Sequence, residues 1–191
     1  MSLVQSSSQF SLRDFLRFPE ITPAREYIEG KIYQKPRLRG KQERVLNRLL
    51  TEINKTGKKQ KTAYAFTDLR CTFANKYSLV PDLSIFNWNN LPVDEQGKLK
   101  HDQEIVPNWV IEFLSPEDNS TRALNNILTC LQQGSQLGWL IDAQEKRVIS
   151  FPQGEQPMVY QGDEQCLPIL TGLRTLKLSA SDLFQSSFNS H

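Results

Sequence analysis

The chain has 191 residues, 38% of them hydrophobic and 23% charged, with a formal net charge of +2. These proportions are those of an ordinary globular protein, and they argue against disordered and fibrous classes. No apolar run approaches the roughly 20 residues that a membrane-spanning helix needs, and the first residues lack the basic start and apolar stretch of a signal peptide. We therefore expect a cytoplasmic protein without a membrane partner.

The length fits one domain that can bury a sizeable core without disulfides or a structural metal. We expect this domain at residues 13–185, between a loose serine-rich segment at 1–12 and an unanchored tail at 186–191. The three cysteines are odd in number and widely spaced, which fits neither a disulfide framework nor a zinc site. Since the chain has only two histidines, its chemistry must rest mainly on carboxylates.

Positive charge is concentrated in one part of the chain. Residues 31–61 hold eleven Lys and Arg against two Glu, a net charge of +9, so the remaining residues carry −7. Such a segment is typical of phosphate binding, because neutralising backbone phosphates releases their condensed counterions. The alternative interpretation is the solvated face of a helix, and the sequence leaves both open.

The first predicted elements are a strand, a helix and three further strands. Glu26–Gln34 alternates in the way of a strand. Apolar residues at helical spacing predict an amphipathic helix over Lys41–Lys55; they are Val45, Leu46, Leu49, Leu50 and Ile53. Thr62–Phe66 and Arg70–Phe73 are predicted to be the two strands of a hairpin, and Leu79–Phe86 a third strand.

The second half of the chain starts with a long polar loop over Asn87–Asn108. It leads into Trp109–Leu114, an apolar run of the kind found in strands buried on both faces. A second helix follows, with an apolar stripe of Leu124, Ile127, Leu128 and Leu131. Further strands are expected at Gln136–Asp142 and Val148–Phe151, and near Met158 and Leu173. Helices interspersed among strands predict an α/β fold in which a mixed β-sheet is flanked by helices.

Glu112 interrupts the apolar run of the predicted central strand, so its carboxylate has apolar neighbours on both faces of the sheet. An ionised carboxylate in such surroundings costs several kcal/mol unless it is paired, hydrogen-bonded or bound to a cation. Glu112 therefore needs a partner, either a metal ion or a basic side chain such as Arg122.

Asp82 follows Pro81 inside a segment that otherwise suits a strand, although aspartate is depleted in strands. Proline there indicates an edge or a bulge, where the next side chain can be re-aimed. Two carboxylates on neighbouring strands, Asp82 and Glu112, can share one Mg²⁺ or Mn²⁺, because these hard cations prefer oxygen ligands. Such an ion would lower the pKa of a bound water. The alternative for Asp82 is an ordinary strand-end aspartate.

Four short motifs give the chain a resemblance to a known family. They are EG at Glu29–Gly30, the pair Pro81–Asp82, VIEFLSP at Val110–Pro116 and GWLID at Gly138–Asp142. In this order and spacing they resemble the putative restriction endonuclease family of bacterial proteins, a branch of the PD-(D/E)XK nuclease superfamily. The resemblance covers about residues 26–151 and implies a restriction-endonuclease-like fold.

The resemblance also implies which side chains act. It assigns Asp82 and Glu112 as ligands of Mg²⁺ or Mn²⁺, and Glu29, the glutamate before glycine, as a third member of the acidic cluster. For Glu29 the alternative is an ordinary exposed strand charge. Many nucleases of this superfamily act as dimers, so the resemblance further implies a homodimer.

Several positions depart from the pattern of the resembling family. The superfamily's lysine two residues after the glutamate is Leu114 here. In many family members a lysine on the following helix takes its place, one turn after an aspartate, but those positions hold Asn126 and Arg122. Arg122 stays protonated and cannot act as a base, although it could stabilise a phosphate. Gln42 stands where a histidine often opens the first helix.

The leading hypothesis is a Mg²⁺-dependent or Mn²⁺-dependent endonuclease that hydrolyses nucleic-acid phosphodiester bonds, with DNA as the expected substrate. Asp82, Glu112, Glu29 and Arg122 would carry the chemistry, and the basic helix would bind the phosphate backbone with little sequence preference. The alternative is a module that kept the fold, lost efficient cleavage and binds nucleic acid or a protein partner. A carboxylate-based hydrolase of glycosides or esters would need no metal, but it leaves the basic segment unexplained.

Overall fold

The computed structural model describes residues 10–99, 104–115 and 120–185. The expected tail at 186–191 and most of the expected N-terminal segment lie outside these described residues. Regular structure begins with a short helix, α1 (Leu12–Phe15), and the hydroxyl of the preceding serine caps it by accepting a hydrogen bond from a main-chain N–H.

A six-stranded sheet forms the centre of the fold, in the order β10-β9-β8-β7-β6-β3. β7 and β8 run parallel, and every other neighbouring pair is antiparallel. β7 and β8 are buried along their whole length, as expected of central strands. The six strands are β3 (Ala63–Phe66), β6 (Leu83–Asn87), β7 (Trp109–Phe113), β8 (Leu137–Asp142), β9 (Arg147–Pro152) and β10 (Met158–Gln161).

A second sheet is antiparallel and has four strands, in the order β2-β1-β5-β4. Its strands are β1 (Arg25–Ile28), β2 (Lys31–Gln34), β4 (Cys71–Phe73) and β5 (Tyr77–Leu79). Between β5 and β6 the chain crosses from this sheet to the larger one through Val80, Pro81 and Asp82. Nothing in the sequence pattern distinguishes these strands from those of the larger sheet.

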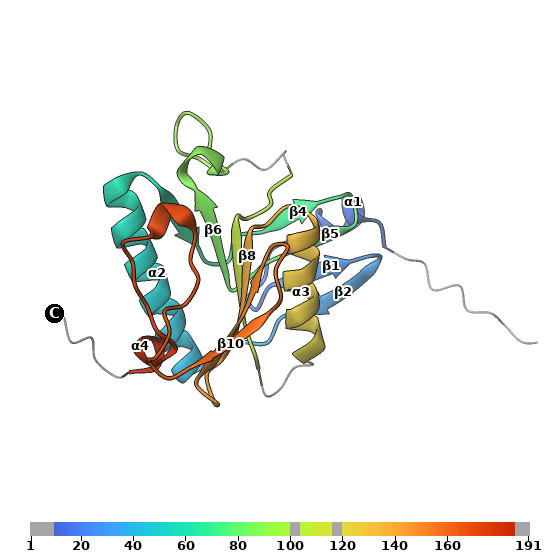
Figure 1. The fold of residues 1–191 in the computed structure, drawn as a ribbon. Coiled ribbons are helices and arrows are strands. Elements are labelled where there is room, and N and C mark those ends of the chain that lie inside the picture. The colour runs from blue at the N-terminus through green and yellow to red at the C-terminus, as the bar shows by residue number, and fades with distance from the viewer. Residues whose placement is uncertain (1–9, 100–103, 116–119, 186–191) are drawn as a thin grey trace, which may run out of the picture.

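Helices cover both faces of the large sheet. Figure 1 shows α2 (Lys41–Gln60) and α4 (Ala180–Phe184) on one side, and α3 (Ser120–Gln132) with the small sheet on the other. α2 buries Val45, Leu49 and Ile53 in one apolar core, and α3 buries Ala123, Ile127 and Cys130 in another. Two short 3₁₀ helices are η1 (Trp88–Asn90) and η2 (Thr171–Leu173). The predicted α/β class, a mixed sheet flanked by helices, is confirmed.

The helices of the described chain do not include one that is both long enough and apolar enough to cross a membrane. The most basic of them, α2, carries its apolar residues on one stripe and its charges outward, as its spacing predicts.

Four sequence predictions of secondary structure were wrong. The strand expected over Leu79–Phe86 is interrupted at Val80–Asp82, where the chain crosses from β5 in one sheet to β6 in the other. The strand expected over 26–34 is two strands, because Glu29 and Gly30 form a turn with φ of 48° and 89°. The expected hairpin of 62–66 with 70–73 does not form, since β3 and β4 lie in different sheets. The strand expected near Leu173 is the 3₁₀ helix η2.

Candidate active site

Lys35 bridges the two carboxylates that the sequence singled out. Its Nζ lies 2.8 Å from Asp82 Oδ1 and 2.9 Å from Glu112 Oε2. It also donates a 2.8 Å hydrogen bond to the main-chain carbonyl of Val80. None of the three charged side chains is more than 10% exposed. Two acidic residues far apart in the sequence are thus held around a single positive charge.

The crossover between the two sheets positions this cluster. The pairing of β6 with β7 sets Leu83 opposite Ile111, which brings the preceding Asp82 to the end of β7 where Glu112 stands. Asp82 Oδ2 accepts a 2.8 Å hydrogen bond from the main-chain N–H of Phe113. Asp82 therefore fastens the start of β6 to the end of β7, while its other oxygen is left for Lys35.

Two further buried polar side chains surround Glu112. Asn126 of α3 donates from Nδ2 to Glu112 Oε1 at 3.1 Å, and to the two oxygens of Glu26 at 3.2 and 3.3 Å. Glu26 of β1 also accepts a 2.9 Å hydrogen bond from the main-chain N–H of Val80. Glu26 and Asn126 are 0% and 3% exposed. The network thereby joins α3, both sheets and the crossover.

Burial and charge repulsion set the protonation of the cluster. Burial first, and then the neighbouring carboxylates of Asp82 and Glu26, raise the pKa of Glu112 well above its ordinary value of 4.5, although Lys35 opposes them. Burial disfavours the Lys35 ammonium ion, but the surrounding carboxylates outweigh burial and raise the pKa of Lys35 above its ordinary value of 10.5. Lys35 therefore stays protonated, and Glu112 takes up a proton more readily than an ordinary glutamate.

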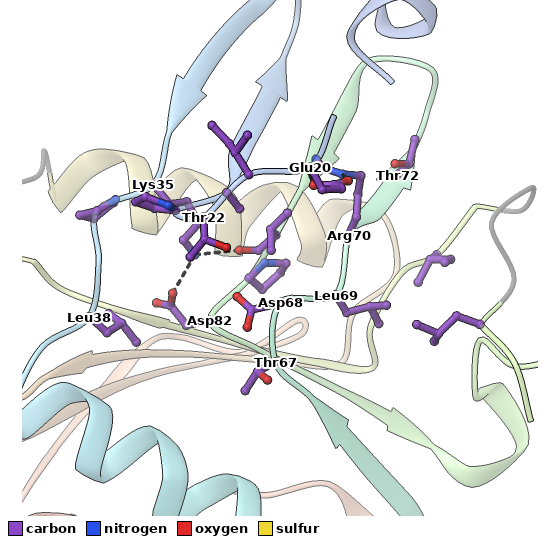
Figure 2. Close-up of a pocket in the computed structure, with 18 of the residues that line it drawn as sticks. Glu20, Thr22, Lys35, Leu38, Thr67, Asp68, Leu69, Arg70, Thr72 and Asp82 are labelled. Carbon is purple, nitrogen blue, oxygen red and sulfur yellow. Dashed lines mark hydrogen bonds and ion pairs between the residues drawn. The ribbon is translucent and has the colours of Figure 1, made fainter. Parts of the chain in front are cut away.

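An open cleft of about 1130 Å³ leads to the cluster. Lys35 and Asp82 lie in its wall, whereas the Glu112 side chain, only 3% exposed, is set deeper. Figure 2 shows the carboxylate of Asp82 beneath Lys35, with Asp68 beside it in the direction of Arg70. A cleft of this size is at the upper end of ordinary binding sites, so it has room for a segment of a polymer.

Glu29 does not join the cluster. It lies exposed in the turn between β1 and β2, where its Oε1 accepts a 2.9 Å hydrogen bond from the Tyr77 hydroxyl. The expectation that Glu29 completes the acidic group is therefore not met. Glu26, in the strand before the turn, contacts the cluster through Asn126 and Val80.

Arg122 and Gln42 lie beside the cluster. Arg122 donates to the main-chain carbonyl of Gln34 at 3.1 Å, and its guanidinium carbon is 5.7 Å from the centre of the Tyr33 ring, which places it against β2. Gln42 donates from Nε2 to the main-chain carbonyl of Leu114 at 2.7 Å, so it ties the first turn of α2 to the end of β7.

Lys35 and Glu26 are the two cluster residues that the sequence predictions missed. Lys35 is one of eleven cations in residues 31–61, and no local pattern marks it out. Glu26 carried a usable signal, because a glutamate beside Tyr27 and Ile28 in a predicted strand raises the same question of compensation as Glu112. The weight given to the EG dipeptide directed attention to Glu29 instead.

The donor set suits a hard divalent cation. Asp82 and Glu112 already share one cation, the Lys35 ammonium, and the buried Oδ1 of Asn126 has no hydrogen-bond partner within the described part of the chain. Mg²⁺ and Mn²⁺ prefer oxygen donors of this kind. Across residues 10–99, 104–115 and 120–185, however, no three His, Cys, Asp or Glu side chains are grouped to hold a metal by themselves. The two carboxylates would need water or main-chain oxygens to complete the coordination, with Lys35 displaced from at least one of them.

A mixed sheet with a carboxylate pair at the end of its central strand defines a nuclease-like fold of the restriction-endonuclease type. The chain belongs to the Uma2 family, described as putative restriction endonuclease, which matches residues 12–181. It is also similar to the crystal structure of a putative nuclease belonging to DUF820 from Anabaena variabilis, with 41% sequence identity and a TM-score of 0.86 over 92% of this chain and 97% of that chain. A search of curated proteins gave no match. The family resemblance drawn from the four motifs is confirmed.

Proposed function

We propose that this protein is a metal-dependent endonuclease that hydrolyses nucleic-acid phosphodiester bonds, with DNA as the expected substrate. The observation that carries the proposal is the pair Asp82 and Glu112, joined by one cation at 2.8 and 2.9 Å beside an open cleft. Membership of a family described as putative restriction endonuclease supports the reaction class. The net charge of +9 over residues 31–61 supports a polyanionic substrate.

Each residue of the cluster has a role that follows from its contacts. Asp82 and Glu112 would hold Mg²⁺ or Mn²⁺, which when bound supplies a water of lowered pKa and stabilises charge on the phosphoryl oxygens. Asn126 holds Oε1 of Glu112, so the other oxygen of that carboxylate is directed toward Lys35. Glu26 fixes Asn126 in turn, and it acts as a positioning residue.

Lys35 replaces the lysine that is absent at Leu114 and Asn126. Its ammonium contacts both candidate metal ligands, which is where such a lysine must act. Because its pKa is raised, Lys35 would orient the attacking water or stabilise charge on the phosphate, and it would not accept a proton. Lys35, which directly follows β2, therefore supplies the positive charge that a lysine on β7 or α3 would otherwise supply.

A module that binds nucleic acid without cleaving it is the second candidate, and one observation favours it. Lys35 compensates both carboxylates, and Glu112 is almost fully buried, so the cluster could serve only as an internal ion pair. In that case the ammonium would keep its place, and divalent ions would have no effect on the protein.

Cleavage of supercoiled and single-stranded DNA with Mg²⁺ or Mn²⁺ distinguishes the two functions. Wild type is compared with Asp82→Asn and Glu112→Gln, and Glu29→Gln serves as the matched control because it removes an exposed carboxylate outside the cluster. The endonuclease should nick DNA only with metal, should lose this activity in the first two variants and should keep it in the control.

Salt-sensitive binding of DNA with no cleavage, unchanged in all three variants, would favour the binding module. The absence of both binding and cleavage would favour a protein partner. Light scattering of the purified protein tests the homodimer that the family resemblance implies.

A further inference from the structure

A second hollow, separate from the catalytic cleft, opens beside the first turns of α2. Its volume is about 410 Å³, and it lies between α2, the turn after β8 and the C-terminal helix α4. Figure 1 shows the start of α2 next to α4. We call it the basic groove, and the cations among its lining side chains are Lys41, Arg44, Arg48 and Lys146.

The lining of the basic groove has four cationic side chains and no carboxylate. Lys41, Arg44 and Lys146 are exposed. Arg48 donates a 2.8 Å hydrogen bond from Nη1 to the main-chain carbonyl of Gln185. Burial lowers the pKa of Arg48, and the charges of Asp182 on α4 and Glu52 on α2 oppose that effect. A surplus of three exposed cations therefore faces the solvent in a concave surface, which is the arrangement that attracts phosphate groups.

The basic groove and the catalytic cleft both lie near the carboxyl ends of the central strands β7 and β8. β7 and β8 are parallel and end at the same level, with Phe113 opposite Ile141. Glu112 stands at the end of β7, and Ala143 of the groove directly follows β8. The first turns of α2 form a wall of both hollows. Glu43 and Leu46 line the cleft, and the two residues between them, Arg44 and Val45, line the groove.

We propose that the basic groove binds the phosphates of the nucleic-acid strand that flanks the bond to be cut. A nucleic-acid strand that leaves the catalytic cleft over the start of α2 would contact Arg44 and then Lys146. The groove would thus add phosphate contacts without adding contacts to the bases. The inference rests on the proposed nuclease function, and it specifies where the substrate is held away from the reacting phosphate. Contacts of this kind strengthen binding and leave the chemical step unchanged.

The test compares two pairs of substitutions that remove the same charge from exposed lysines and arginines. Arg44→Gln with Lys146→Gln changes the groove, and Lys55→Gln with Lys59→Gln changes the far part of α2 as the matched control. Binding of a duplex of about 30 base pairs is measured in EDTA over a range of salt. The groove pair should weaken binding about tenfold. It should also reduce the slope of the logarithm of the binding constant against the logarithm of the salt concentration by about two, because each lost phosphate contact reduces that slope by about one. The control pair should stay within about twofold of wild type.

Equal weakening in both pairs would overturn the inference, because a general charge effect would explain it, and so would no weakening in the groove pair. Inorganic phosphate provides a further arm. Saturable binding of phosphate that depends on Arg44 and Lys146, with duplex binding unchanged, would mean a pocket for the free anion and would equally overturn the inference.

The two proposals fail in distinguishable ways. If Asp82→Asn abolishes cleavage and the groove pair binds duplex like wild type, the nuclease function stands and the groove inference fails. If wild type shows no metal-dependent cleavage and the groove pair still loses binding, the groove stands without the nuclease. In kinetics, the groove pair should raise KM for a long duplex and leave kcat unchanged.

Discussion

Replacing Lys35 by methionine would test whether its ammonium compensates the buried carboxylates. The change keeps most of the aliphatic length but removes contacts to Asp82, Glu112 and the Val80 carbonyl, at 2.8, 2.9 and 2.8 Å. Removing one partner of a buried ion pair costs about 3–5 kcal/mol, because the other partner is left uncompensated. Glu112 limits this loss, since its pKa is raised and it can take up a proton. The destabilisation should therefore be largest at alkaline pH and should shrink toward acid pH.

Unfolding by heat and by urea in EDTA measures the effect. A loss of about 3–5 kcal/mol corresponds to a fall in Tm of roughly 6 to 20 °C for a chain of this length. Lys31→Met is the matched control, because Lys31 is an exposed lysine of β2, the strand that Lys35 directly follows, and the change should alter stability by less than about 0.5 kcal/mol. If the carboxylates bind a divalent ion, Mn²⁺ should stabilise Lys35→Met more than wild type. A loss below about 1 kcal/mol would refute the view that Lys35 compensates the cluster.

Two further predictions concern charge at the cleft. The hydrogen bond from Arg70 lowers the pKa of Glu20 below its ordinary 4.5 against the effect of burial. The pair therefore stabilises the fold above pH 4.5 and loses this contribution as the pH falls through the folded-state pKa. The stability difference between wild type and Arg70→Gln should shrink on acidification, and an unchanged difference at acid pH would contradict this. In the double variant Lys35→Leu with Asn126→Lys the ammonium comes from α3, where residue 126 already contacts Glu112, and it should recover cleavage that Lys35→Leu alone loses. Full activity in Lys35→Leu would instead rule out a role for the ammonium.

The local part of the fold was predictable from the sequence, because periodicity records which face of an element is buried. α2 and α3 each bury one apolar stripe, and β7 is an apolar run interrupted by Glu112 alone. Strand pairing was not predictable in the same way. Thr62–Phe66 and Arg70–Phe73 look like a hairpin, yet the residues between them lead from one sheet to the other. Short strands with similar composition carry no record of which sheet they join.

For the candidate site, the sequence predicted which two carboxylates need a compensating charge, but it did not predict which side chain supplies that charge. Glu112 and Asp82 stood out because each is a carboxylate in a segment that suits burial, and the structure brings them together around Lys35. The identity of the compensating cation depends on contacts between residues remote in sequence, and one lysine in a basic segment has no distinguishing neighbours. Glu29 was chosen over Glu26 because it precedes glycine in the EG dipeptide, but that dipeptide forms the turn between β1 and β2, away from the cluster.

The crossover at Val80–Asp82 places the candidate site at a junction of the fold. Asp82 fastens the start of β6 to the end of β7, Glu112 accepts a hydrogen bond from Asn126 of α3, and Glu26 of the small sheet accepts one from Val80 of the crossover. A chain that did not cut nucleic acid would still draw part of its stability from these hydrogen bonds. Selection for a folded chain alone would therefore act to keep these side chains, independently of any chemistry.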